Sequence, residues 1–327
     1  MKIFLSGGSG FVGSTLAKAL AREGHKLRLL MRKTSSAKNL AGVDYEVAAG
    51  DLHNIESLRE AVKNVDVIYH VAGQIAACKS EDFFRHNVEG TENLIRVAQS
   101  VPHLHRFVYL SSLAAAGPAA EGRAHCEEIS PKPVSAYGQS KLAGEEMLRN
   151  SGLPSVIVRP PIVYGPYDRG MLSFFKIVNL GIHPALGLGK VDRRYSFIHV
   201  DDLVEILVRL GISQRQMSPA ELFYAAGEGE YTWDETMRFI AAGLNKKTWK
   251  LPIPIAVLKL VGKLNSAFGR IAGVNPPLNH DKIKEIEACY WTCSNRKIKE
   301  ILDFKPRWDL PQGLSETAKW YATHSWL

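Results

Sequence analysis

The sequence predicts an α/β protein with a doubly wound parallel sheet, followed by a smaller, mainly helical C-terminal lobe. Three observations predict this class: six short apolar runs in the first 160 residues have the length of buried strands, helical patterns separate them, and the alternation stops near residue 160. Alternating strands and helices form parallel sheets with right-handed crossovers and helices on both faces. Ligands of such sheets bind outside the carboxyl ends of the strands, where we expect the site.

The expected strands are runs of apolar and β-branched residues bounded by turn-forming residues. They are KIFLS (2–6), KLRLLM (26–31), YEVAA (45–49), DVIYHVA (66–72), RFVYLSS (106–112) and SVIVRP (155–160). Helical patterns lie between them at 11–23, 54–63, 84–100 and 137–150. We therefore expect residues 1–160 to form the first domain.

The pattern changes after residue 160. FIHVDDLVEILVRL restarts a strand-to-helix pattern, LFYAAG indicates another strand, and residues 251–323 are mainly helical. We expect residues 161–327 to form a second lobe that is partly discontinuous and returns elements to the first domain. Within this lobe the stretch 251–277 is apolar with scattered lysines, and we interpret it as core, with a lid or an interfacial helix as the alternatives.

Composition restricts the class of protein. The chain has 327 residues, of which 46% are hydrophobic and 23% charged, and this apolar content excludes a disordered chain. The N-terminal MKIFLSGGSG is not a signal peptide, and no apolar run approaches the roughly 20 residues that span a bilayer, so we expect no integral membrane segment. The four cysteines (Cys78, Cys126, Cys289 and Cys293) lack C-x-x-C spacing, which is typical of a reduced, cytoplasmic protein.

Charge points to a small anionic ligand. The net charge is +8, but the basic residues are spread along the chain without a nucleic-acid-binding motif, so we expect no nucleic-acid partner. A phosphorylated cofactor accounts for part of the charge. The two cysteines of CYWTC have no histidines at ligand spacing, and we expect no metal site.

The segment KIFLSGGSGFVGSTLAKAL predicts a strand, a glycine-rich turn and a helix. Gly7, Gly10 and Gly13 have G-x-x-G-x-x-G spacing, which allows a tight turn and a close approach to a pyrophosphate at the helix N-terminus. A turn without a ligand is the alternative. The position of the glycine motif straight after a strand favours a dinucleotide site. We expect Ser9, Phe11 and Val12 to belong to the same site. Residues 1–160 are therefore expected to form a dinucleotide-binding domain.

The ends of the next strands indicate which dinucleotide binds. NAD sites place an acid after the second strand, whereas an arginine there accommodates a 2′-phosphate. Here Met31 is followed by Arg32 and Lys33, so we predict NADP(H) in preference to NAD(H); two solvated charges are the alternative. Four further residues are expected around the cofactor: Asp51 and Leu52 at the adenine, and Ala72 and Gly73 beside the cofactor backbone.

SAYGQSKLAG (135–144) places Tyr137 and Lys141 four residues apart, on one face of a helix that begins near Ser135. Ser111 and Ser112 end the fifth strand at the same edge of the sheet. A phenol is a poor base at neutral pH, and we expect a neighbouring ammonium to lower its pKa. The pattern therefore predicts proton transfer that assists hydride transfer, with Ser112 bonded to the substrate oxygen.

The chain resembles the extended short-chain dehydrogenases/reductases, the NAD-dependent epimerase/dehydratase superfamily, over nearly its whole length. SGGSGFVG, GDL, HVAG, NVEGTENL, VYLSS, YGQSK, VRPPIVYGP and FIHVDDL occur in that family's order. The resemblance implies a Rossmann fold and a homodimer formed through the Tyr137 helix and its neighbour. It also implies that Tyr137 is the acid/base, Lys141 its partner and Ser112, five residues before Gly117, the third member.

The resemblance implies two further contacts. Asn87 corresponds to an asparagine behind the site, with a packing amide as an equal alternative. Arg159 and Pro160 end the sixth strand near the nicotinamide. His199, Asp201 and Asp202 are expected to cap a helix rather than to act in catalysis.

Departures from the family pattern indicate the substrate. Nucleotide-sugar enzymes of the family resemble R-Y-F-N-V-Y-G and R-D-F-I-H at positions where this chain has RPPIVYG and RRYSFIH. Ile162 therefore replaces a diphosphate-binding asparagine and Tyr195 an arginine, although Arg193 and Arg194 are possible substitutes. An apolar residue at a polar contact favours a hydrocarbon. RP…YGP resembles the dihydroflavonol 4-reductase and 3β-hydroxysteroid dehydrogenase branch.

We therefore expect an NADP(H)-dependent oxidoreductase that interconverts a ketone and a secondary alcohol on a largely apolar small molecule. One alternative is a nucleotide-sugar epimerase or dehydratase that retains NAD. Another is a non-catalytic dinucleotide-binding sensor or assembly subunit, against which the intact set of Ser112, Tyr137 and Lys141 argues.

Overall fold

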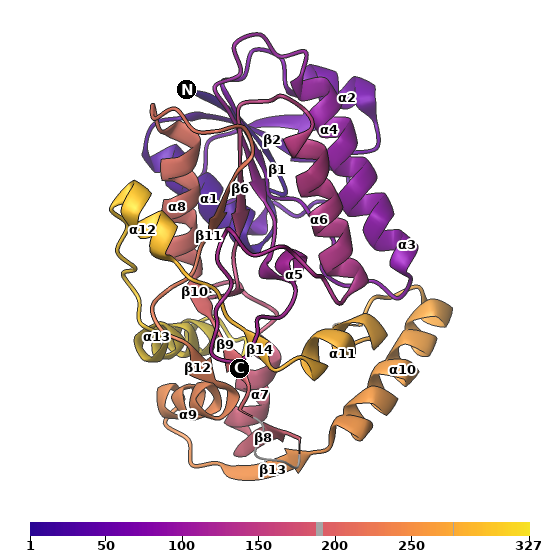
Figure 1. Cartoon of the computed structure of the whole chain (residues 1–327), viewed down its shortest axis with the longest axis vertical. Helices are drawn as coiled ribbons and strands as arrows, with labels where there is room; N and C mark the ends of the chain where they lie inside the picture. The colour runs from indigo at the N-terminus through magenta and orange to yellow at the C-terminus, as the bar shows by residue number, and fades with distance from the viewer. Residues whose placement is uncertain (188–191, 277) are drawn as a thin grey trace.

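A seven-stranded parallel sheet forms the upper part of the molecule in the computed structural model, which describes residues 1–187, 192–276 and 278–327 (Figure 1). Its order is β11-β6-β5-β4-β1-β2-β3, and every neighbouring pair is parallel. The strands are β1 Lys2–Ser6, β2 Lys26–Met31, β3 Glu46–Ala49, β4 Val67–His70, β5 Arg106–Leu110, β6 Ser155–Arg159 and β11 Glu221–Tyr224. The expected strands lie where the sequence predicts them.

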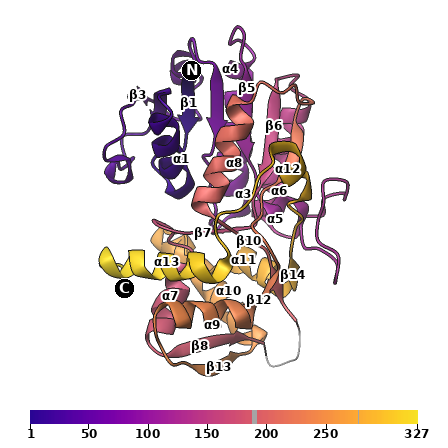
Figure 2. The ribbon, with the colours of Figure 1, turned by 90° about the vertical axis from the view of Figure 1, so that its left-hand side faces the viewer.

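Helices cover both faces of the sheet. Helices α1 (Phe11–Arg22) and α8 (Val200–Ile212) pack on one face, and α2 (Ile55–Ala61), α4 (Gly90–Ala98) and α6 (Ala136–Arg149) on the other (Figure 2). Successive residues of a strand point to opposite faces, so Ile3 and Leu5 join the α1–α8 core while Phe4 joins the α2–α4–α6 core. This confirms the doubly wound sheet.

Three elements from beyond residue 160 belong to this layered part. β11 extends the sheet next to β6, α8 packs against α1, and α12 (Arg296–Leu302) packs against β11 and α8. The boundary between a first domain and a second lobe at residue 160 stays a prediction.

Most of the remaining chain lies below the carboxyl edge of the sheet, where α7 Leu172–Asn179, α9 Trp233–Gly243 and α13 Leu310–Thr323 surround a separate core (Figure 2). Helices α10 Ile255–Ala272 and α11 His280–Glu287 belong to this lower part and pack on each other. The lower part also contains short strand pairings that the sequence analysis did not predict: β7 Ile162–Tyr164 with β10 Phe197–His199, β8 Ile182–Leu186 with β13 Trp249–Ile253, and β9 Arg194–Tyr195 between β12 Tyr231–Thr232 and β14 Tyr290–Trp291. Runs this short carry little periodicity.

The interpretation of residues 251–277 as core is wrong for the large side chains of α10. Its leucine, valine, isoleucine and phenylalanine side chains face solvent at six positions: Val257, Leu260, Val261, Leu264, Phe268 and Ile271. The buried positions of the helix are small residues instead, Gly262, Ser266 and Gly269. Pro277, the last residue of that stretch, lies outside the described residues. Across the described chain, helices fall short of the length and apolar character needed to cross a membrane.

Candidate active site

The glycine-rich turn lies between β1 and α1, at the carboxyl edge of the sheet. Gly7 has a φ of 79°, and a Cβ on it would come within 2.6 Å of the backbone nitrogen of Ala72 after β4. A Cβ on Gly13 would overlap the carbonyl oxygen of Gly7. Gly10 is the N-cap of α1 and makes no side-chain cap, so the first N–H groups of the helix remain available to a ligand. The turn has the shape that a pyrophosphate requires.

The ends of β2 and β3 place several basic groups together. Arg32 and Lys33 are exposed directly after β2. After β3, His53 Nε2 lies 3.4 Å from His86 Nδ1. Burial lowers the pKa of His86, and the charges of His53, Arg85 and Arg32 lower it further. Arg32 therefore belongs to a cluster of basic side chains, two of which the sequence analysis missed because they come from distant segments.

Asp51 and Leu52 hold the loop after β3. The Asp51 carboxylate accepts a hydrogen bond of 2.9 Å from the backbone N–H of His53, and the Leu52 carbonyl accepts one of 3.0 Å from Asn93 Nδ2. Leu52 packs against Gly90 of α4: a Cβ added to Gly90 would lie 3.2 Å from the Cβ of Leu52.

The residues after β4 meet the predicted asparagine and lysine. An ideal Cβ on Gly73 would lie 3.6 Å from Asn87 Oδ1 and 3.7 Å from Lys141 Nζ. Asn87 lies in a π-helical turn (Phe84–Glu89), accepts from the N–H of Gln74 and donates to Ser140 Oγ. Such turns occur frequently at functional sites. Asn87 thus acts as a packing amide between the β4 loop and α6, and its contact with a cofactor stays a prediction.

Tyr137, Lys141 and Ser112 come together at this edge. Ser112 caps the short helix α5 (Leu113–Ala116) by accepting from the N–H of Ala114, and its hydroxyl lies near enough to the Tyr137 phenol to lower the pKa of that phenol. Ser135 caps α6, so the helix begins where the sequence predicts. Pro160 contributes its carbonyl, which accepts from the N–H of Leu113 and ties β6 to α5. The structure therefore brings the three predicted catalytic residues to one place.

The expected lowering of the Tyr137 pKa by Lys141 is wrong in this structure. Burial raises the pKa of Tyr137 to about 12, and the nearby Ser112 hydroxyl only partly offsets this. The Lys141 ammonium instead lies over the ring of Tyr109, 4.2 Å from its centroid. Burial also lowers the pKa of Lys141 to about 7, against the opposing charge of Glu145. Desolvation dominates both groups because they lie inside the protein.

Glu145 and Arg159 form a buried ion pair beneath these residues, which the sequence analysis did not predict. Arg159 donates from Nε and Nη2 to the Glu145 carboxylate at 2.8 and 2.6 Å, and Ser111 donates to the same carboxylate at 2.5 Å. Arg159 also donates to the Tyr224 hydroxyl at 2.8 Å. A glutamate eight residues after the tyrosine on one helix face is the sequence signal that would have found this pair.

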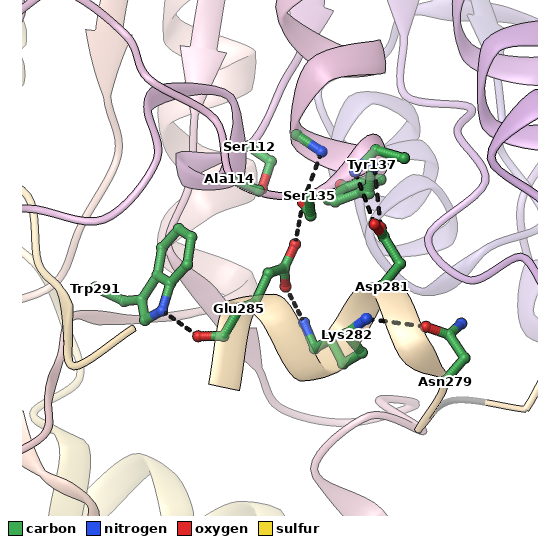
Figure 3. A network of polar contacts seen from close by, with 11 residues as sticks. Ser112, Ala114, Ser135, Tyr137, Asn279, Asp281, Lys282, Glu285 and Trp291 are labelled. Carbon is green, nitrogen blue, oxygen red and sulfur yellow. Dashed lines mark hydrogen bonds and ion pairs between the residues drawn. The ribbon is translucent and has the colours of Figure 1, made fainter. Parts of the chain in front are cut away.

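Helix α11 holds the first turn of α6 from below (Figure 3). The Asp281 carboxylate accepts from the N–H groups of Ala136 and Tyr137 at 2.8 and 3.2 Å, and Ser135 donates to Glu285 at 2.7 Å. These acceptors satisfy N–H groups that a helix leaves unpaired at its start. The contacts join segments about 145 residues apart, so no local pattern indicates them.

The two arginines considered as diphosphate ligands are bonded within the protein. Arg193 is buried and donates from Nη1 to the carbonyls of Ile286 and Ala288, while Arg194 pairs with Asp192 at 2.7 Å. Tyr195 and Ile162 pack in the aromatic core that includes Trp233. The surroundings of these two positions are therefore apolar, as the sequence predicts.

The aspartates after β10 have a structural role. His199 caps α8 by accepting from the N–H of Asp201, and the Asp202 carboxylate accepts from the N–H groups of Arg307 and Trp308. His199 therefore caps the helix as expected, whereas Asp202 joins α8 to the segment before α13.

Comparison with known proteins agrees with this geometry. Residues 3–223 match the model of the NAD dependent epimerase/dehydratase family. This chain belongs to that family. It is 30% identical over 325 residues to a protein of Caulobacter vibrioides named ceramide reductase, covering 99% of this chain and 96% of the relative. It is 27% identical to the UDP-glucose 4-epimerase of Vibrio cholerae, covering 97% of this chain and 94% of the relative.

A solved structure shows the same fold. The UDP-glucose 4-epimerase of Thermus thermophilus, in complex with NAD, superposes with a TM-score of 0.76 at 21% identity and covers 98% of this chain and 99% of its own. The protein is therefore an NAD(P)-dependent oxidoreductase of the extended short-chain type, and its relatives include both reductases and epimerases.

Proposed function

We propose that this protein is an NADP(H)-dependent oxidoreductase that interconverts a ketone and a secondary alcohol on a largely apolar molecule. The observation that carries the substrate class is the apolar packing around Ile162 and Tyr195, the positions of the family's diphosphate ligands, beside which Arg193 Nη1 is bonded to two backbone carbonyls. Leaving a diphosphate unpaired next to buried apolar groups is costly. The relative named ceramide reductase supports a lipid-like substrate.

Three features fit a dinucleotide. The Gly7–Gly13 turn would hold the pyrophosphate, Arg32 with its neighbouring histidines would contact a 2′-phosphate, and Lys141 would hydrogen-bond the nicotinamide ribose beside Gly73. The bound reduced nicotinamide would supply the hydride. A homodimer formed through α6 and its neighbour α4 is part of the proposal.

The catalytic step assigned to this chain is proton transfer. Because burial raises the pKa of Tyr137 to about 12, the phenol keeps its proton at neutral pH and would donate it to the carbonyl oxygen as that oxygen becomes an alkoxide. Ser112, which lies beside the phenol, would donate its one hydroxyl proton to the same oxygen and orient it. A protonated phenol is the form that reduction of the ketone requires.

A substrate screen tests this function. NADPH oxidation is followed with aliphatic, aromatic, steroid and long-chain ketones alongside nucleotide sugars, with Tyr137→Phe as the control variant. We expect turnover with apolar ketones, and its loss in Tyr137→Phe while cofactor binding is retained. Full activity in that variant would contradict the assignment, and tightly retained NAD with turnover of a nucleotide sugar would favour the epimerase.

The cofactor preference has its own test. In a thermal-shift titration at 100-fold over the dissociation constant, NADP⁺ should stabilise the protein by about 2.7 kcal/mol, and NAD⁺ at the same concentration by less. Arg32→Asp should reverse the order because it replaces the donor by a charge that repels the phosphate. Equal shifts for both nucleotides in the unmodified protein would contradict the preference.

A further inference from the structure

Helix α10 presents an apolar stripe to solvent. The stripe consists of Val257, Leu260, Val261, Leu264, Phe268 and Ile271, and these residues recur at helical spacing; we call this stripe the α10 face. Three of its side chains are among the most exposed hydrophobics, with Leu264 at 61%, Phe268 at 63% and Ile271 at 88% exposure. Helix α10 lies at the outer edge of the molecule and packs against α11 (Figure 1). An amphipathic helix of a globular protein normally buries such a stripe.

The packing of α10 fixes this orientation. A Cβ on Gly262 would lie 2.6 Å from Cγ1 of Ile283 in α11, and one on Gly269 would overlap the Cys78 sulfur. Ser266 accepts from the N–H of His280 at 2.8 Å. The side of α10 with small residues therefore fits closely against α11 and the loop after β4. Rotating the stripe inward would force large side chains into these contacts.

The charged residues of α10 itself have one sign. Residues 255–272 contain Lys259, Lys263 and Arg270 and no acid, in a chain of net charge +8. Lys259 pairs with Glu287 of α11, and Arg270 Nε donates to the Cys78 carbonyl, so both cations lie on the side of the helix that adjoins the protein. A helix with an exposed apolar stripe and flanking cations has the form of helices that lie in the interface of anionic membranes.

We propose that the α10 face docks this protein on the surface of an anionic phospholipid membrane, with α10 in the plane of the interface. Apolar side chains enter the acyl boundary while Lys263 contacts phosphate groups. A membrane is favoured over a protein partner because an anionic surface complements Lys263 and the net charge of +8 and requires no matching shape.

Docking in this way would place the membrane beside the proposed catalytic tyrosine. Helix α11 packs on α10 and also accepts hydrogen bonds from the first turn of the Tyr137 helix through Asp281. At its other end α10 is tied to the loop after β4 through Asn275, which accepts from the N–H of Cys78. An apolar ketone dissolved in the bilayer would reach the site from this side. This last step rests on the proposed function, whereas membrane docking does not.

Vesicle sedimentation tests the docking without any substrate. The full chain is mixed with vesicles of phosphatidylcholine and phosphatidylglycerol in equal parts, and separately with phosphatidylcholine alone. We expect cosedimentation with the anionic vesicles, weaker binding to the neutral ones, and weakening by added salt. Leu264→Glu/Phe268→Glu should lower the partition coefficient on the order of 100-fold, because two apolar side chains are lost and two anions gained.

The matched control is Val47→Glu, which changes a side chain that is 57% exposed on β3, at the edge of the sheet. It should bind vesicles like the unmodified protein. Circular dichroism checks that all variants fold. Phe268→Trp detects docking in a variant that still binds, because brominated phospholipid should quench the fluorescence of the introduced tryptophan.

Four results would overturn the proposal: an unmodified protein that stays in the supernatant, equal loss in Val47→Glu, no quenching in Phe268→Trp, or a Leu264→Glu/Phe268→Glu variant that still binds. Sedimentation velocity identifies another occupant. If that double variant dissociates a larger assembly and the unmodified chain does not bind vesicles, the α10 face is an interface between copies. Turnover is measured separately on a soluble ketone, so loss of activity and loss of docking remain distinguishable.

Discussion

The buried pair of Glu145 and Arg159 should dominate the stability of the site. The carboxylate is completely buried and the guanidinium is 1% exposed, so neither charge is solvated by water. Glu145→Gln keeps the shape of the side chain but leaves Arg159 as an uncompensated charge. Breaking such a pair on one side costs about 3–5 kcal/mol of unfolding free energy. Ser111 and Arg149 also lose an anionic acceptor, so we expect the upper part of this range.

The assay is urea denaturation, followed by tryptophan fluorescence and by circular dichroism. Arg149→Ala is the matched control because Arg149 bonds the same carboxylate from a side chain that is 38% exposed. An exposed partner of this kind contributes about 0–1 kcal/mol. A loss below about 1 kcal/mol for Glu145→Gln, or a loss equal to that of the control, would refute the reasoning that burial makes this pair essential.

Glu145→Gln should also change the ionisation of Lys141. The Glu145 charge raises the pKa of Lys141 against the stronger effect of burial, which sets it at about 7. Without that charge the pKa falls further, and the ammonium is lost at lower pH. The alkaline limb of the pH–activity profile should therefore move to lower pH in Glu145→Gln and stay in place in Arg149→Ala.

Three further changes test other parts of the structure. Asp281→Ala removes the acceptor for two N–H groups of α6 and should lower the unfolding free energy by about 1–2 kcal/mol in urea, whereas Lys284→Ala, on the same helix, should change it by less than about 0.5 kcal/mol. Burial lowers the pKa of His70 to about 3, so the unfolded chain takes up a proton before the folded protein does as pH falls. The unfolding free energy should therefore drop by up to about 1.4 kcal/mol per pH unit between roughly pH 6.5 and 3. If His70→Gln shows the same dependence of unfolding free energy on pH, this histidine is not its source. Gly13→Ala should cost about 1–3 kcal/mol and abolish nucleotide-induced thermal shifts, since its Cβ overlaps the Gly7 carbonyl; normal binding in a stable variant would contradict the close approach.

Much of the fold could be predicted because its signals are local. The strands of the sheet are continuous apolar runs, and the turn at Gly7 needs a left-handed backbone that glycine adopts freely. The spacing of Tyr137 and Lys141 already places them on one helix face. The predicted site residues fall together because parallel strands end at the same edge of a sheet.

The pKa of Tyr137 could not be predicted in the same way. Sequence proximity identifies Lys141 as the nearest charge, but the direction of the pKa depends on how much water the fold removes from the phenol. Likewise, the sequence presents Arg193 as a possible ligand of a diphosphate. Only the path of residues 286–288 shows that Arg193 Nη1 donates to backbone carbonyls instead.

The sequence by itself determined the succession of strands and helices along the first 160 residues, the glycine turn, and the residue types at each strand end, because these depend on neighbours within a few positions. Tertiary structure alone decided that Glu145 bonds Arg159, that Asp281 holds the first turn of α6, and that α10 turns its apolar side outward. The physical reason is that burial and pairing depend on which surfaces meet. For α10, the small residues that allow close packing on α11 determine which side remains in contact with solvent.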